Sequence, residues 1–435
     1  MNQASTQSPT AASAGVDLRK RGLAVGIGNF MEWFDFAIYG YFAAVIGAQF
    51  FPSDDPSASL LASLATFAAG FLARPIGALV LGPLGDRLGR RAVLVITVFG
   101  MGVATALMGL LPTFDQIGIW APALMVVLRL VQGMMVGGEW SSAAAYLIES
   151  APGTRRARTA TILTTTAGLA FLTGTVLATL LTATLSAEQV AAWGWRLPFL
   201  ASFVMAVVAI YIRRRLGETP VFEQVAARRA AGETAPLRAD AVARAFVLAL
   251  TFSALFGVSL YYLITYANNH LSGVVGMARF DALLACSIGL GCYVLVNPLI
   301  GMIADRIGRR PVVLASAAGL VLLGLPIFWL WDTGSFPLVL LGLVVLGVLV
   351  AMAGVMNVVL LVEVFPASIR SSGAALGHNI ALALLAGPGP FIAALLIRLT
   401  GNSLAPAGYL VAVALLAGIV LATLLPETLR RDISE

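Results

Sequence analysis

Lysine, cysteine, histidine and charge of either sign are all scarce in this sequence. Of 27 basic residues only Lys20 is a lysine, and the 435 residues include two cysteines and two histidines. A Walker-type phosphate loop and a Schiff base each need a suitably placed lysine. Cys286 and Cys292 lie in one hydrophobic segment and are too few for a metal cage or a disulfide framework. We therefore expect no cofactor and no metal.

The low content of charged residues also indicates the environment in which the protein folds. Charged residues make up 11% of the chain and hydrophobic residues 59%, with a mean hydropathy of +0.93. Soluble domains carry about 25% charged residues, and the 44 glycines suit closely packed transmembrane helices. The composition predicts an integral membrane protein. The net charge of +6 does not indicate nucleic-acid binding, because the basic residues lie in short loops between apolar segments.

Apolar runs long enough to cross a bilayer, roughly 20 residues, occur twelve times. The predicted spans are 22–47, 58–82, 92–111, 119–147, 157–184, 196–212, 245–270, 280–303, 312–331, 336–362, 372–399 and 406–425. The fold class is therefore an all-α membrane protein with twelve transmembrane helices. Most basic residues fall in alternate loops, which by the positive-inside rule places these loops and both termini in the cytoplasm.

The longest polar stretch divides the spans into two sets of six. We expect a disordered tail over 1–18, a six-helix bundle over 19–212, a cytoplasmic linker over 213–244, a second six-helix bundle over 245–426 and a cytoplasmic tail over 427–435. No apolar core with a small-residue cleavage site precedes the first span, so no signal peptide is expected.

An internal repeat supports this division. Residues 82–91 read GPLGDRLGRR and residues 301–310 read GMIADRIGRR, each between the second and third span of its half. A second pair of matches follows the fourth span of each half: Glu149, Pro152 and Arg156 correspond to Glu363, Pro366 and Arg370. The chain is thus a tandem duplication, the plan of the major facilitator superfamily, whose central site lies between the halves.

The repeated loop resembles that superfamily's signature, and its charges predict a latch that holds the cytoplasmic ends together in one state. The alternative is that these arginines only satisfy the positive-inside rule, which does not explain the aligned Asp and Gly. The predicted cytoplasmic gate comprises Asp86, Arg87, Arg90, Arg91, Glu149, Arg156, Asp305, Arg306, Arg309, Arg310, Glu363 and Arg370.

Several stretches resemble the metabolite:proton symporter family, which includes α-ketoglutarate, citrate, shikimate and proline/betaine permeases. They are GNFMEWFDFAIYGYF (28–42), RPIGALVLGPLGDRLGRR (74–91), RLVQGMMVGGEW (129–140), GWRLPF (194–199), ETPVFEQ (218–224) and FPASIRSSGAALGHNIA (365–381). His378 stands where an aromatic residue is expected, and no long charged heptad tail follows span twelve, which argues against an osmosensor.

Ionisable residues inside a membrane are functional candidates by default. In the N-terminal half they are Glu32, Asp35, Arg74, Arg129 and Glu139. Glu32, Arg74 and Glu139 each lie about three helical turns from the cytoplasmic end, roughly 15–18 Å at about 1.5 Å per residue. Three helices are thus expected to bring mixed charges to one depth. The alternative is structural ion pairing, with Arg74 neutralising Glu32 or Asp35 and no part in transport.

The resemblance assigns roles to these charges. Arg129 looks like the fourth-span arginine that steers protonation in proton-coupled members, so proton coupling is expected from Glu32, Asp35, Arg129 and Glu139. Arg74 resembles an arginine that grips a substrate carboxylate, which a guanidinium can bind through two parallel hydrogen bonds.

The C-terminal half offers polar and aromatic groups instead. Tyr262 and Tyr266 are four residues apart and share a helix face. They are expected to line the cavity, to close it from outside, or to pack as an interfacial aromatic belt. Asn357 and Asn379 complete the predicted substrate-binding set with Arg74, Tyr262 and Tyr266. His378 is open to a helix-contact role or to pH sensing.

The sequence thus predicts a secondary transporter in a bacterial inner membrane, which imports a small organic carboxylate or zwitterion with protons and works as a monomer in the lipid bilayer. The alternative is a proton antiporter of the same fold that exports drugs or metabolites. Such exporters usually carry a Gly-Pro-rich motif in span five, and residues 163–184 contain no proline. An enzyme is not expected, because no nucleophile–base pair or metal cluster occurs.

Overall fold

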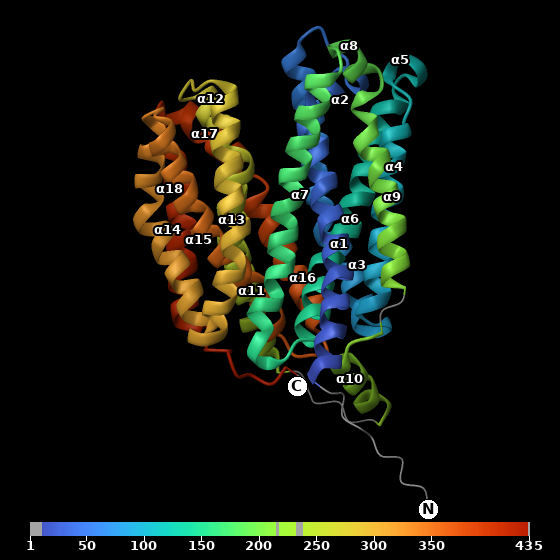
Figure 1. Cartoon of the computed structure of the whole chain (residues 1–435), viewed down its shortest axis with the longest axis vertical. Coiled ribbons are helices and arrows are strands. Elements are labelled where there is room, and N and C mark those ends of the chain that lie inside the picture. Colours follow the sequence, from blue (N-terminus) through green and yellow to red (C-terminus); the bar gives the residue numbers. More distant parts are fainter. Residues whose placement is uncertain (1–10, 215–216, 232–237, 434–435) are drawn as a thin grey trace, which may run out of the picture.

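Two helical bundles stand side by side in the computed structural model (Figure 1), which describes residues 11–214, 217–231 and 238–433. In those residues every regular element is a helix. The expected disordered tail lies outside the described residues up to residue 10, and the first helix begins at Ala11.

The N-terminal bundle contains the elements before residue 214. They are α1 (Ala11–Tyr41), α2 (Ala43–Phe50), α3 (Pro56–Leu88), α4 (Arg90–Leu110), α5 (Phe114–Ile117), α6 (Trp120–Glu149), η1 (Gly153–Arg155), α7 (Arg156–Thr184), α8 (Ala187–Gln189), η2 (Val190–Gly194) and α9 (Arg196–Arg213). Helix α10 (Pro220–Ala230) then lies beneath this bundle (Figure 1).

The C-terminal bundle follows. Its elements are α11 (Ala239–Tyr261), η3 (Tyr262–Tyr266), α12 (Ala267–Gly273), α13 (Arg279–Ile307), α14 (Arg309–Asp332), α15 (Phe336–Glu363), α16 (Arg370–Ala381), η4 (Leu382–Ala386), α17 (Gly389–Thr400) and α18 (Ala405–Leu424).

The prediction of an all-α fold with twelve spans is confirmed. Within the described residues, 11 helical segments are long and apolar enough to cross a membrane. Helix α1 is the twelfth, and its lower hydropathy reflects the acids Glu32 and Asp35. Spans seven and eleven are not single α-helices, since the π-turns η3 and η4 interrupt them. Such π-turns often occur at functional sites.

The ten-residue repeated signature is mostly helical, and the loop within it is a single residue. Helix α3 continues through Leu88 and α4 starts at Arg90, so only Gly89 separates them. Gly308 plays the same part between α13 and α14. Their φ angles are 101° and 109°, in a region where glycine is strongly favoured because it has no Cβ. Each reversal therefore requires its glycine.

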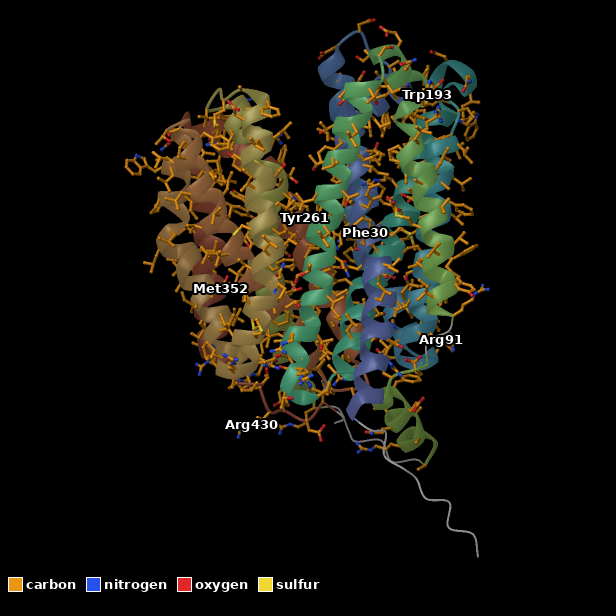
Figure 2. The ribbon with its side chains drawn as sticks, in the orientation of Figure 1. Phe30, Arg91, Trp193, Tyr261, Met352 and Arg430 are labelled. Carbon is orange, nitrogen blue, oxygen red and sulfur yellow. The ribbon has the colours of Figure 1, made fainter. Side chains whose placement is uncertain are left out.

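We call the end of the molecule that carries residues 82–91, 149–158, 301–310 and 363–372 the arginine-rich end. Arg91 and Arg430 mark it in Figure 2, and Trp193 marks the opposite end. The halves approach very closely here. A Cβ added to Gly82 of α3 would lie 2.8 Å from the Cα of Ser372, and one added to Gly301 of α13 would lie 2.9 Å from the Cα of Arg158. Backbone contact between the halves thus needs a glycine in each repeat.

Inside the N-terminal bundle, α3 and α6 also meet backbone to backbone. A Cβ on Gly137 would lie 2.2 Å from the carbonyl oxygen of Arg74. Small residues allow transmembrane helices to pack this closely. This crossing brings the backbone of α3 at Arg74 directly against α6 at Gly137.

We predict that Gly301→Val separates the two halves at the arginine-rich end, because the added side chain overlaps the backbone of α7. Leu88 and Ile307, both exposed, occupy equivalent places in the repeats. Nitroxide labels on cysteines at these positions, with Cys286 and Cys292 replaced by serine, should show a longer distance by double electron–electron resonance. Gly291→Val is the matched control, since a Cβ at Gly291 meets no atom within 4 Å. An unchanged distance distribution in Gly301→Val would refute this packing argument.

Candidate functional site

Arg74 lies at the centre of an aromatic cage built by the N-terminal half. Its guanidinium carbon is 5.8 Å from the ring centre of Trp33, 4.7 Å from that of Phe36 and 4.5 Å from that of Phe71. The residue is 2% exposed, and its Nε and Nη2 atoms have no hydrogen-bond partner among the described residues. Cation–π contacts stabilise the charge, but two strong donors stay unused.

Glu32 and Tyr261 border this cage. Glu32 is fully buried, one residue before Trp33. The ring of Tyr261, from α11 of the other half, meets Phe71 edge-on at 5.6 Å. Tyr261 interacts electrostatically with Arg74, Glu32 and Arg129. Charges of α1, α3 and α6 thus lie around a tyrosine of the C-terminal half, while the expected place of Glu139 in the same cluster stays a prediction.

Asp35 belongs to a relay of hydrogen bonds toward Arg129. The hydroxyl of Thr105 donates to Asp35 Oδ2 at 2.6 Å, and Gln132 Nε2 donates to Thr105 Oγ1 at 2.8 Å. Arg129 Nη1 donates in turn to Gln132 Oε1. Asp35 Oδ1 has no hydrogen-bond partner among the described residues. The acid and the arginine are thus coupled through two neutral side chains.

Thr105 and Gln132 were not among the residues predicted from the sequence. Both are polar side chains that are fully buried, and a polar residue inside a predicted span was the only feature of the sequence that pointed to them. Glu139 has a similar unpredicted partner, because the hydroxyl of Thr97 in α4 donates to its carboxylate. Phe36 packs against both guanidinium groups, 4.7 Å from Arg74 and 4.7 Å from Arg129.

A stack of rings closes the interface between the halves near Glu139. Trp140 of α6 stacks on His378 of α16, with ring centres 5.7 Å apart and planes 8° apart, and on Phe256 of α11. Trp140 Nε1 donates to Asn357 at 3.3 Å, and Asn357 donates to Ser253 at 2.9 Å.

Ser253 completes a closed circuit, since its hydroxyl lies 3.0 Å from His378 Nδ1. Asn379 adds another link between the halves, donating to the carbonyl of Gly137 at 2.8 Å. Asn357, Asn379 and His378 thus all bridge the two halves in this layer, which gives His378 a helix-contact role. The substrate-binding assignment of the two asparagines stays a prediction.

Tyr262 and Tyr266 do share a face, with rings 4.9 Å apart, but that face is turned into the C-terminal half. Tyr262 donates to the carbonyl of Pro406 at 3.0 Å. The Tyr266 hydroxyl lies 3.1 Å from His270 Nδ1, and His270 Nε2 lies 2.8 Å from Asp332. These contacts tie α12 to α14 at the end opposite the arginine-rich end. Their place in substrate binding stays a prediction, and it is the neighbouring Tyr261 that packs on Phe71 of the Arg74 cage.

At the arginine-rich end the two repeats exchange ion pairs. Arg370 of the second repeat lies 2.7 Å from Glu149 of the first, and Arg156 of the first lies 3.5 Å from Glu363 of the second. Each acid also meets an arginine of its own half: Arg90 lies 3.4 Å from Glu149, and Arg309 lies 3.3 Å from Glu363. Both glutamates are buried.

Two aspartates bind helix N-termini across the interface. Asp86 accepts hydrogen bonds from the backbone amides of Ser371 and Ser372, at 3.1 and 3.0 Å, where α16 begins. Asp305 accepts from the amides of Ala157 and Arg158, at 3.0 and 2.9 Å, where α7 begins. A carboxylate at a helix N-terminus satisfies unpaired amides and complements the helix dipole.

The four remaining predicted gate residues, all arginines, do not take part in this exchange of ion pairs in the described part of the chain. Arg87 and Arg306 are exposed. Arg310 donates to the carbonyl of Ala422 at 2.7 Å, and Arg91 donates to that of Arg214. The structure gives these four no ion pair across the interface in the described residues.

Two glutamate–threonine pairs were missed by the sequence analysis. Glu218 accepts from the amide of Arg91 at 3.1 Å, and Thr219 donates to Glu149 at 2.6 Å. In the second repeat Glu427 accepts from the amide of Arg309 at 2.9 Å, and Thr428 donates to Glu363 at 2.6 Å. The repeat itself was the available signal, because the dipeptide Glu-Thr follows the sixth span of each half.

Comparison with known proteins gives consistent matches. Residues 25–376 match the family model described as Major Facilitator Superfamily. The chain is 35% identical over 428 residues to a proline/betaine transporter of Escherichia coli (strain K12), covering 96% of this chain and 85% of that protein.

A second relative has a broader name. The chain is 33% identical over 428 residues to a glycine betaine/proline/ectoine/pipecolic acid transporter of Dickeya dadantii, with the same coverage of 96% and 85%. Among solved structures, the proton:xylose symporter XylE bound to 6-bromo-6-deoxy-D-glucose superposes with a TM-score of 0.82. That likeness has 17% sequence identity and covers 97% of this chain and 98% of XylE, and it shows the shared fold.

We predict that Glu149→Gln loosens the arginine-rich end. The substitution leaves Arg90 and Arg370 buried with less compensating charge, a change that costs about 3–5 kcal/mol in buried ion pairs. Hydrogen–deuterium exchange of a peptide spanning 365–376 should become faster, and the melting temperature should fall. Glu188→Gln, at an exposed acid of the opposite end, should change neither. Unaltered exchange in Glu149→Gln would show that the ion pairs do not hold the halves together.

Proposed function

Because the chain belongs to the Major Facilitator Superfamily, we propose that it imports a small carboxylate-bearing solute together with protons, by alternating access between its two halves. As a member of that superfamily the protein is a multi-pass membrane protein and a secondary transporter, not an enzyme. The solute, the coupled ion and the direction of transport are the proposal.

The observation that carries the choice of solute is the pair of unused donors on Arg74. A buried donor without a partner normally costs about 1–3 kcal/mol, and more when the group is charged. Arg74 Nε and Nη2 are such donors, in a cage that faces the other half. A carboxylate would accept from both nitrogens and neutralise the guanidinium, which a sugar hydroxyl would not do.

A zwitterion fits the surroundings of Arg74 better than a simple anion. Proline and glycine betaine, which name the relatives, each carry a carboxylate and a cationic nitrogen. The ring of Trp33 lies 5.8 Å from the guanidinium carbon of Arg74 and meets the ring of Trp140 edge to face at 5.9 Å. Aromatic faces attract quaternary ammonium groups, and the buried Glu32, which precedes Trp33 in α1, would add a negative charge.

Proton coupling is assigned to the acids of the N-terminal half. Asp35 is fully buried. One of its carboxylate oxygens accepts a hydrogen bond that links it indirectly to Arg129, and the other has no partner among the described residues. Protonation of Asp35 removes the cost of a buried negative charge. Binding of a proton and binding of the solute can therefore favour the same change of conformation. Glu32 and Glu139 stay in the proposed set. One charge moving inward across 100 mV supplies about 2.3 kcal/mol, roughly a fiftyfold accumulation.

The ion pairs at the arginine-rich end are the proposed gate. With them formed, the halves are joined at that end, and they have to separate for the solute to leave there. By the positive-inside rule we propose that this end faces the cytoplasm, with the inner membrane as the proposed location. Import then runs from the end marked by Trp193 in Figure 2 toward the end marked by Arg91.

Uptake by the purified protein in liposomes tests the proposal. With radiolabelled glycine betaine and L-proline as probes, we expect accumulation when the outside is acidic, abolished by a protonophore. Asp35→Asn should keep exchange of internal for external solute but lose accumulation, while Asp115→Asn, at an exposed acid, should retain both. Uptake that ignores the gradient would rule out proton coupling. Extrusion of cationic dyes without uptake of any carboxylate would rule out import.

Arg74→Lys should raise the KM for glycine betaine by about 10- to 100-fold. A lysine keeps the charge but cannot offer two parallel N–H groups, and a hydrogen bond to a charged group contributes about 1.5–3 kcal/mol. Initial uptake rates over a range of concentrations measure the effect, with the melting temperature as a check on folding. Arg398→Lys, at an exposed position, is the control. An unchanged KM would remove Arg74 from the site.

A further inference from the structure

Tyr261 is the last α-helical residue before the break in span seven. Helix α11 ends at Tyr261, and the π-turn η3 follows over Tyr262–Tyr266. The label in Figure 2 places the residue near mid-height of the molecule. It belongs to the C-terminal half, yet its ring packs on Phe71 of the N-terminal half, 5.6 Å between ring centres with the planes 77° apart.

The hydroxyl of Tyr261 is buried and unsatisfied. The residue is 6% exposed, and its oxygen has no hydrogen-bond partner among the described residues. Buried hydroxyls of tyrosine usually find a partner. The adjacent tyrosines follow that rule, Tyr262 with the carbonyl of Pro406 and Tyr266 with His270. Tyr261 is therefore the exception within the YYLITY segment.

The surroundings of that hydroxyl are charged. Tyr261 interacts electrostatically with Arg74, Glu32 and Arg129, all from the N-terminal half. Phe71 joins it to Arg74, since the same ring lies 4.5 Å from the guanidinium carbon. Two nitrogens of Arg74 also lack partners. Three unused donors, from opposite halves of the protein, thus border one aromatic ring.

We propose that the Tyr261 hydroxyl binds the solute carboxylate together with Arg74, so that a single ligand group is held by both halves. This inference rests on the proposed function, because it adds a residue to the same site. A carboxylate has room for several hydrogen bonds on its two oxygens, so the guanidinium and the phenol can be satisfied at once. The bound solute then supplies the hydrogen bonds that these donors lack in each half.

This arrangement makes Tyr261 a specificity-determining residue. A site that hydrogen-bonds a polar group of its ligand discriminates strongly against an analogue without that group, because its own buried donors stay unpaired. Choline has the cationic nitrogen of glycine betaine but an alcohol in place of the carboxylate. Glycine betaine should therefore be preferred to choline, and part of that preference should depend on the Tyr261 hydroxyl.

Tyr261→Phe tests the inference. We expect the KM for glycine betaine to rise about 10-fold, with kcat within about threefold of the parent, and the preference over choline to fall by a similar factor. The melting temperature should stay the same or rise, because the variant removes a buried hydroxyl that lacks a partner. Tyr409→Phe is the matched control from the same half. Its hydroxyl donates to the carbonyl of Leu385 at 2.8 Å, so that variant should keep the parent KM.

A double-mutant cycle with Arg74→Lys adds a sharper readout. If both residues bind one carboxylate, the effects on KM should be less than additive in Arg74→Lys/Tyr261→Phe. A raised KM in Arg74→Lys with a parent-like KM in Tyr261→Phe would overturn this inference and leave the proposed function standing. A fall in kcat without a change in KM would also overturn it, since it indicates a role in movement. If no carboxylate is taken up by the parent protein, both proposals fail.

Discussion

The exchange of ion pairs between the two repeats joins the halves at the arginine-rich end, and the closed geometry above it depends on this exchange. Glu149 of the first repeat pairs with Arg370 of the second, and Glu363 of the second repeat pairs with Arg156 of the first. Each buried acid thus needs the opposite half for part of its compensating charge. Because unpaired buried charges cost several kcal/mol, separation of the halves has to bring water to these groups. An interface of this kind favours two discrete states over a gradual opening.

Above this layer the halves contribute differently to the site. The N-terminal half provides the charges: Arg74 in its aromatic cage and Asp35 in its relay. The C-terminal half provides polar and aromatic groups that meet them, among them Tyr261 and the circuit of Asn357 and His378. In this arrangement one half carries the carboxylates and guanidinium groups, while the other responds through hydrogen bonds and ring contacts. A solute bound between them would affect both, which is the coupling that alternating access requires.

Much of the fold was predictable because hydropathy, loop charge and the repeat are properties of the chain read in one dimension. Twelve spans followed from run lengths, and the tandem duplication from the two Gly-Asp-Arg-Gly-Arg-Arg loops. The candidate site was only partly predictable. The buried charges were identified by their cost in lipid, whereas Thr105 and Gln132 were overlooked, because a single neutral polar residue gives little signal until its partner is known.

By itself the sequence determined the span count, the duplication and the presence of buried charge at Glu32, Asp35 and Arg74. Only the tertiary structure decided which groups meet. Successive residues of an α-helix point about 100° apart, so the rotation of span seven brings Tyr261 against Phe71 of the Arg74 cage and turns Tyr262 into the C-terminal half. That rotation is set by packing against neighbouring helices and by the π-turn that follows. Neither is encoded in the local pattern, and this is why the decisive contact emerged only from the assembled bundle.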